Sequence, residues 1–264
     1  MKCRGRLVQS VSCADAVLGH YGMGDTIRVE SMRFYRLLIL GLGFIALSAR
    51  AELPDYQVFS AQGTQLLLWV SSERGRAEPE IQASQKLAVQ GVEVWSLDPL
   101  SAYFLPQLSR SMDAISQQDM ADWLRSALAS GKRVSVFAVS RAAVPVLRAA
   151  ALLKPAQRRQ IGVVLMYPNV YQVAEPLAAP DYLDIGPLKG LRVRILQPRR
   201  SAATPWLPGL VKHLKGYGAT VESVVLENVR EGYWARETPT EFEIAESRRM
   251  DGLLLRELNV LGQK

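Results

Sequence analysis

The sequence predicts an α/β fold, a three-layer sandwich in which a mainly parallel sheet lies between two layers of helices. Apolar, β-type runs of about six residues alternate with segments of helical periodicity along most of the chain. Helical connections between such strands favour parallel pairing with right-handed crossovers. No internal repeat, low-complexity segment or linker divides the chain after residue 51. We therefore expect one domain over residues 52–264.

The predicted elements follow one another in a regular order. The expected strands cover residues 58–59, 65–70, 92–97, 133–139, 161–167, 191–196 and 221–226. The expected helices cover residues 81–90, 119–128, 142–153 and 206–214. Thr240 and Glu243 have capping-box spacing, which predicts the start of a C-terminal helix that carries Leu253, Leu254, Leu255 and Leu258.

The segment between the fifth and sixth predicted strands bears on access to the site. Residues 168–190, about 23 in number, connect strands 161–167 and 191–196. A segment of this length is too short for a separately folded cap domain. The sequence therefore predicts no cap domain and an open site, which suits a large or membrane-bound partner.

The N-terminal part of the chain predicts export. Residues 32–36 form a short segment that is positively charged through Arg33 and Arg36, and residues 37–47 form an uninterrupted apolar run. Ala49 and Ala51 then form an A-x-A arrangement. We interpret residues 32–51 as a signal peptide cleaved after Ala51, which indicates a periplasmic protein. The apolar run is short for a bilayer span, so no transmembrane span is expected after cleavage, although a retained anchor stays an alternative. Residues 1–31 are interpreted as a non-native upstream extension or a disordered one.

Composition limits the chemistry of the mature chain. Cys3 and Cys13 both precede the predicted cleavage site, which excludes disulfides and cysteine metal sites in the mature protein. Only His213 remains among the histidines, and no Gly-rich phosphate loop is present, so we expect no metal and no cofactor. The removed part carries a net charge of +4 of the total +7, and the remaining +3 is too mild to indicate nucleic acid.

The stretch Ala138-Val139-Ser140-Arg141-Ala142 is the main candidate for chemistry. An apolar strand leads to a serine flanked at two residues' distance by small side chains, and a small-residue helix follows. A nucleophile elbow requires this pattern, because the strand and helix pass close together at a tight turn. Pro145 fits near a helix start. The alternative is an ordinary strand–loop–helix junction in which the serine only caps the helix.

The order of strands and helices, together with this elbow, resembles the α/β-hydrolase fold superfamily. Asp98 at the end of a strand, Tyr103-Phe104, the serine elbow and the proline after it are similar to its periplasmic VirJ-type members. The resemblance implies that Ser140 is the nucleophile and that the N–H of Arg141 forms part of the oxyanion hole. It also implies a second oxyanion donor near Ser71 and envelope or lipid substrates.

The other triad members implied by the resemblance are not found at their expected positions. Where the histidine should follow the last strand, the chain reads Gly232-Tyr233, and the acid loop at 197–201 contains no carboxylate. His213 is predicted in a helix, off its apolar face. Glu231 is a spare carboxylate near the missing histidine, or an ordinary exposed Glu. Three functions therefore stay open: a serine hydrolase of ester or acyl bonds with an incomplete triad, a catalytically inactive envelope binding protein, or a stability or assembly partner with no ligand.

Five further residues are possible ligand contacts. Tyr103 and Phe104 occupy a proline-flanked loop that either forms an apolar lip or tucks into the core. Arg199 and Arg200 follow a strand and could bind an anionic group or remain solvated. Tyr233 replaces the expected histidine. The expected partner is an unknown small-molecule, lipid or envelope ligand.

Overall fold

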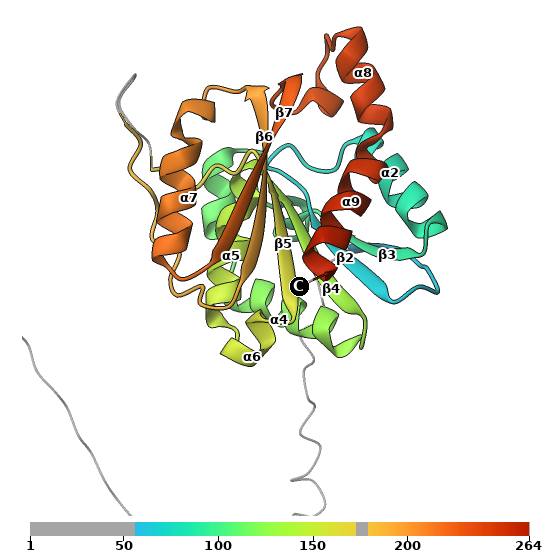
Figure 1. Cartoon of the computed structure of the whole chain (residues 1–264). Coiled ribbons are helices and arrows are strands. Elements are labelled where there is room, and N and C mark those ends of the chain that lie inside the picture. The colour runs from blue at the N-terminus through green and yellow to red at the C-terminus, as the bar shows by residue number, and fades with distance from the viewer. Residues whose placement is uncertain (1–55, 173–178, 264) are drawn as a thin grey trace, which may run out of the picture. The chain divides into compact units, whose positions relative to one another are not determined.

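The computed structural model describes residues 56–172 and 179–263, which form a seven-stranded sheet with helices on both faces (Figure 1). The strand order is β1-β3-β2-β4-β5-β6-β7; β1 is antiparallel to β3, and all other pairs are parallel. The strands are β1 (Tyr56–Phe59), β2 (Gln65–Val70), β3 (Val92–Leu97), β4 (Arg133–Val139), β5 (Ile161–Met166), β6 (Arg192–Arg200) and β7 (Thr220–Arg230). The predicted three-layer α/β sandwich is confirmed.

Helices from different parts of the chain cover the two faces of the sheet (Figure 1). The helices are α2 (Glu78–Val89), α3 (Pro99–Ala102), α4 (Gln117–Ala129), α5 (Ala143–Leu152), α6 (Pro155–Arg158), α7 (Leu207–Gly216), α8 (Glu241–Arg248) and α9 (Met250–Gly262). Helices α4, α5 and α7 contribute side chains to the core on one face, and α2 and α9 to the core on the other.

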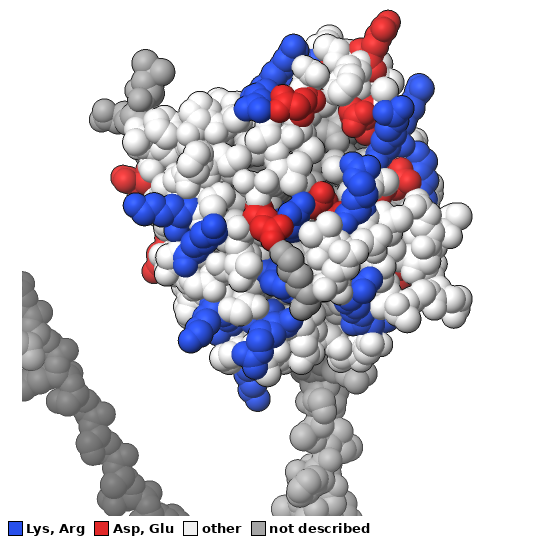
Figure 2. Space-filling view, viewed as in Figure 1, with Lys and Arg blue, Asp and Glu red and all other residues white. Residues whose placement is uncertain are grey.

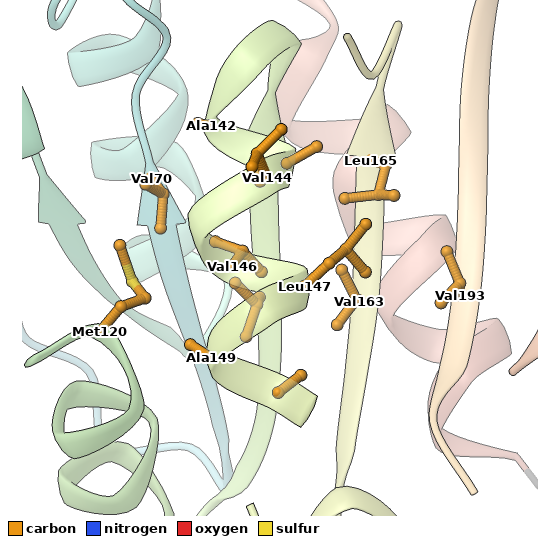
Figure 3. Packing of buried hydrophobic residues seen from close by; sticks show 14 of the residues in the cluster. Val70, Met120, Ala142, Val144, Val146, Leu147, Ala149, Val163, Leu165 and Val193 are labelled. Carbon is orange, nitrogen blue, oxygen red and sulfur yellow. The ribbon is translucent and has the colours of Figure 1, made fainter. Parts of the chain in front are cut away.

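The two cores follow directly from the period-two alternation of side chains along the strands. In β2, Leu66 and Leu68 enter the core beneath α4 and α5, whereas Leu67 and Trp69 enter the core beneath α2 and α9. Because both faces are covered, the strand reads as a continuous apolar run. Figure 3 shows α5 side chains such as Leu147 packing toward β5 at Val163 and Leu165.

Two elements differ from the sequence prediction. The expected C-terminal helix is two helices, α8 and α9, because the backbone leaves helical geometry at Arg249 (φ −104°, ψ 10°). The capping box of Thr240 and Glu243 is present at the start of α8. Strand β6 also continues to Arg200 and pairs with β7 near Arg230. The segment expected as the acid loop is therefore mostly strand.

The predicted signal peptide at 32–51 and the extension at 1–31 lie outside the described residues, and both stay predictions. So does the absence of a cap domain, because residues 173–178 of the intervening segment also lie outside them. Across residues 56–172 and 179–263, no helix combines the length and the apolar character that crossing a membrane requires. In the view of Figure 2, Lys and Arg side chains share the surface with Asp and Glu.

Candidate active site

Ser140 lies directly after β4, at the sharp turn into a 3-10 helix (Ser140–Ala142) and then α5. Its φ of 54° is in the left-handed region, which costs a non-glycine residue about 1–2 kcal/mol. Ala138 and Ala142 on either side are fully buried, so larger side chains have no room there. The N–H of Asn169 donates to the Ser140 carbonyl at 3.0 Å and holds the turn. The tight strand-to-helix turn predicted at Ser140 is confirmed, and its positive φ shows that the turn is strained.

The hydroxyl of Ser140 donates a hydrogen bond to Oε1 of Glu73 at 3.1 Å. Glu73 belongs to the loop after β2, and β2 lies beside β4 with Val70 opposite Ala138. The two loops therefore meet at the carboxyl edge of the sheet, where α/β proteins place their ligand sites. The other carboxylate oxygen, Oε2, is buried and has no hydrogen-bond partner among the described residues.

Sequence reasoning missed Glu73 although a signal was present. The resemblance assigns to the loop after β2 only a backbone oxyanion donor near Ser71. Because neighbouring parallel strands end at the same edge, any carboxylate just beyond β2 was a possible partner for Ser140. The stretch Ser71-Ser72-Glu73-Arg74 contains one such carboxylate.

Ser140 opens onto a cavity of about 300 Å³ at this edge. Its walls come from the loop after β2, the start of α2, the ends of β4 and β5, and the turn after β7. The lining residues are Ser72, Glu73, Arg74, Gly75, Ala77, Glu80, Ser140, Tyr167, Glu231, Gly232, Trp234, Ala235 and Arg236. The cavity is therefore lined mainly by polar and charged side chains, and no histidine is among them.

His213 lies on α7, away from this cavity. Its ring stacks on Tyr182 with centroids 4.7 Å apart, and its Nε2 lies 3.0 Å from the carbonyl oxygen of Leu183. These contacts hold the imidazole ring of His213 against Tyr182 and Leu183. The geometry agrees with the interpretation that His213 is not the base for Ser140.

Glu80 is a buried carboxyl group in the wall of the same cavity. The indole Nε1 of Trp234 donates to it at 3.1 Å, and the hydroxyl of Ser71 donates to it at 3.2 Å. Burial is the largest influence and raises the pKa of Glu80 to about 7, although the two hydrogen bonds oppose that rise. The group is therefore close to half-protonated at neutral pH.

Tyr167 supplies a neutral hydroxyl to the cavity. It follows β5 with a φ of 35°, and its N–H donates to the carbonyl of Leu196. Burial, followed by the negative charges of Glu73, Glu80 and Glu231, raises the pKa of Tyr167 above its usual value. A Cβ atom built on Gly232 would lie 3.6 Å from the tyrosine hydroxyl. The hydroxyl thus reaches the corner where the sequence lacks the expected histidine.

The two predicted oxyanion donors, the backbone N–H groups of Arg141 and Ser71, differ in their hydrogen bonding. The N–H of Arg141 lies in the first turn after the elbow, where backbone N–H groups have no partner within the helix. The Arg141 guanidinium is held by both carboxylate oxygens of Asp113, at 2.9 and 2.6 Å. The N–H of Ser71 instead donates to the carbonyl of Leu97 at 3.0 Å. The Ser71 N–H is therefore engaged with the neighbouring strand and is not free for an oxyanion. Ser72, the next residue of the same loop, lines the cavity, and a second donor in this loop stays a prediction.

The predicted aromatic contacts do not line the Ser140 cavity. The Tyr103 hydroxyl donates to Asp119, and Phe104 is 96% exposed with a φ of 52°. Tyr233 is buried in the core beside Trp234, because the turn after β7 directs its ring inward.

The predicted basic contacts also lie elsewhere. Arg199 pairs with Glu227 on the exposed β6–β7 ribbon, with Nη2 of Arg199 at 2.6 Å from Oε1 of Glu227, and Arg200 is exposed at the end of β6. Glu231 does line the cavity, where it accepts a hydrogen bond from Ser201. Asp98 caps α3 by accepting from the Ser101 N–H, which is a structural role.

The described residues contain no cluster of three or more His, Cys, Asp or Glu side chains that could hold a metal ion. The groups that the cavity offers for chemistry are the serine hydroxyl, the carboxylates, the tyrosine hydroxyl and the backbone N–H of Arg141. A serine hydrogen-bonded to a carboxylate can act as a nucleophile if that carboxylate takes its proton.

The fold is shared with known hydrolases. No family model matches the chain, and no curated protein matches its sequence. Among solved structures, a protein assigned as a dienelactone hydrolase from Klebsiella pneumoniae is 18% identical with a TM-score of 0.55, covering 78% of this chain and 90% of its own. A Pyrobaculum calidifontis esterase is 12% identical with a TM-score of 0.56, covering 87% and 90%. The esterase Est22 is 10% identical with a TM-score of 0.57, covering 81% and 83%.

At these identities the likeness establishes the architecture. The protein has the α/β-hydrolase fold. The resemblance inferred from the strand order and the elbow is therefore confirmed at the level of the fold.

Proposed function

We propose that the protein is an exported serine hydrolase that cleaves an ester or acyl bond, with Ser140 as nucleophile and Glu73 as its base. The observation that carries this proposal is the 3.1 Å hydrogen bond from the Ser140 hydroxyl to Glu73 at a strained elbow. Strain of this kind persists where the surroundings over-determine it, and it clusters at active sites. The hydrolase-fold neighbours give the reaction class further support.

The proposed reaction has two steps. In the first, the Ser140 oxygen attacks the acyl carbon while Glu73 takes the hydroxyl proton, and the N–H of Arg141 stabilises the oxyanion. The bond to the alcohol then breaks, and Glu73 returns the proton to that leaving group. In the second step, water attacks the acyl-enzyme, with Glu73 again accepting and returning a proton, and Ser140 is regenerated.

A fluorophosphonate probe tests this proposal directly, because it forms a covalent bond only with an activated serine. We expect labelling of the wild-type protein and hydrolysis of p-nitrophenyl butyrate. Ser140→Ala should abolish labelling and lower kcat by about 10³-fold or more, as removal of a catalytic nucleophile does. The exposed strand residue Ser223 provides a control, since Ser223→Ala should change neither. Labelling that persists in Ser140→Ala would refute the assignment.

One observation favours the alternative of a binding protein without catalysis. Oε2 of Glu73 has no partner among the described residues, whereas the base of a triad is normally oriented by a third group. In this alternative the same cavity binds an envelope ligand without cleaving it. A folded wild-type protein that neither reacts with the probe nor hydrolyses esters would support the alternative over the hydrolase.

The export part of the proposal depends on residues 32–51, which lie outside the described ones. The charged segment, the apolar run and the A-x-A arrangement of Ala49 and Ala51 support cleavage after Ala51. Mass spectrometry of the protein recovered from the periplasm should find Glu52 as the first residue. A cytoplasmic protein that retains residues 32–51 would contradict this part.

A further inference from the structure

Two arginines line the Ser140 cavity from separate segments of the chain. Arg74 immediately follows Glu73 in the loop after β2, and Arg236 follows the turn after β7. Both residues are exposed, although they belong to the cavity wall. The two guanidinium groups therefore lie toward the solvent-facing part of the cavity, while Ser140, which is 7% exposed, lies in its interior.

The carboxylates of the same cavity already have partners. Glu73 accepts from Ser140, Glu80 accepts from Trp234, and Glu231 accepts from Ser201. All three carboxyl groups belong to the cavity wall, and the buried Glu80 is close to half-protonated at neutral pH. The acidic side chains of this wall disfavour the entry of a small anion into the interior of the cavity.

The arginine donors are, by contrast, largely unused. The Arg74 guanidinium forms no hydrogen bond or ion pair with any described residue, and Arg236 donates only from Nη1, to the Glu231 carbonyl at 3.1 Å. A guanidinium has five N–H donors in a planar fork that matches a carboxylate or a phosphate. The positive charge of Arg74 also opposes the rise in the Tyr167 pKa, so its field extends to the tyrosine hydroxyl in the cavity.

We propose that the substrate carries an anionic group, a carboxylate or a phosphate, which Arg74 and Arg236 bind while its acyl carbon lies at Ser140. This inference rests on the proposed hydrolase function and names the substrate class of the same site. The arginines bind the anion at the entrance, and the acidic side chains of the cavity wall disfavour its deeper entry. The uncharged ester is then the part of the substrate that reaches the serine.

A pair of esters with one leaving group tests the inference. p-Nitrophenyl butyrate is neutral, whereas the p-nitrophenyl monoester of glutaric acid carries a carboxylate at the far end of its acyl chain. We expect kcat/KM to be about tenfold or more higher for the charged ester, since a charge-assisted hydrogen bond contributes that much. The double variant Arg74→Gln/Arg236→Gln should lose this preference, because its kcat/KM for the charged ester should fall to its value for the neutral ester.

Arg249→Gln is the matched control, because Arg249 is an exposed arginine on the break between α8 and α9 and is not in the cavity wall. It should leave the preference unchanged. Hydrolysis of both esters at equal rates by wild type, or a preference that survives in the double variant, would overturn the inference while leaving the hydrolase proposal intact. If neither ester is hydrolysed, the hydrolase proposal itself fails.

Inhibition of p-nitrophenyl butyrate hydrolysis distinguishes a free anionic substrate from an anionic lipid headgroup. Inhibition by glycerol 3-phosphate that disappears in the double variant supports a free anionic substrate. Inhibition only by phosphatidylglycerol vesicles, and not by phosphatidylcholine vesicles, supports the same recognition of a lipid headgroup if it also disappears in the double variant. Inhibition by none of glutarate, glycerol 3-phosphate and phosphatidylglycerol would count against an anion site.

Discussion

The turns after β4 and after β7 lie at the same edge of the sheet and differ in where they place their side chains. After β4 the chain forms the strained elbow of the α/β-hydrolase fold, with Ser140 at a φ of 54°. After β7, Gly232 still turns in the left-handed region at 60°, but the next side chain, Tyr233, is buried in the core where a histidine is expected. Both turns therefore have a left-handed backbone. The turn after β7, however, does not place the side chain of Tyr233 in the Ser140 cavity.

The difference shows that a nucleophile's position and its activation depend on different numbers of contacts. The elbow is fixed by the pairing of β4 with two strands, by the buried Ala138 and Ala142, and by the Asn169 hydrogen bond. A base depends on one side chain within hydrogen-bond reach. That single contact can come from another loop of the same edge, and in the proposed mechanism Glu73 provides it.

The largest effect is expected from removing the carboxylate charge beside Ser140. Glu73→Gln keeps the size of the side chain but removes its ability to accept the serine proton. We expect kcat for p-nitrophenyl butyrate to fall by about 10²–10⁴-fold with little change in KM, as for loss of a general base. Stopped assays of the two proteins at pH 7, with circular dichroism to confirm folding, measure the effect.

The matched comparison for Glu73→Gln is His213→Ala. His213 is held in the α7 layer by Tyr182 and Leu183, so its loss should leave kcat within about twofold, as for a residue outside the machinery. A large loss of activity in His213→Ala together with a normal rate in Glu73→Gln would restore histidine as the base.

The sequence was sufficient to predict the sheet and the elbow. Buried runs such as 133–139 and 161–166 have few alternatives to a central strand, and two small residues around a serine specify a tight turn. The sequence was not sufficient to predict that the Glu73 side chain lies beside Ser140 or that the Tyr233 ring is buried in the core. Which way a loop side chain points depends on neighbouring strands and on packing, and periodicity carries no information about either. The break at Arg249 was missed for the same reason, since the helical pattern continues through it.

A smaller effect is expected from the buried carboxyl group of Glu80, whose pKa is raised to about 7. Between pH 4.5 and 7 the unfolded state ionises at this group while the folded state stays protonated, so stability is lost as pH rises. Below that window its contribution is fully present. The raised pKa corresponds to a loss of about 3 kcal/mol across the window.

Glu80→Gln should remove this component, because the amide is neutral at every pH and its oxygen can still accept from Trp234. The free energy of unfolding in urea, measured at pH 5 and pH 8, should therefore fall less between the two values in the variant than in wild type. Glu78→Gln, an exposed change in the same helix, should retain the full fall. Equal pH dependence in wild type and Glu80→Gln would show that the folded state does not hold this proton.

The smallest expected effect tests the strain at the elbow itself. Ser140→Gly and Ser140→Ala both remove the hydroxyl and should both be inactive, but only glycine adopts a positive φ without steric cost. We expect the glycine variant to be more stable than the alanine variant by about 1 kcal/mol in urea unfolding, because the left-handed penalty of alanine exceeds the extra chain entropy of glycine. At Ser223, in the extended strand β7, the same two substitutions should give the opposite order, since glycine weakens a strand interior. If the alanine variant were the more stable one at both positions, the backbone at Ser140 would not be strained. The conformation of the elbow would then give no support to a functional site.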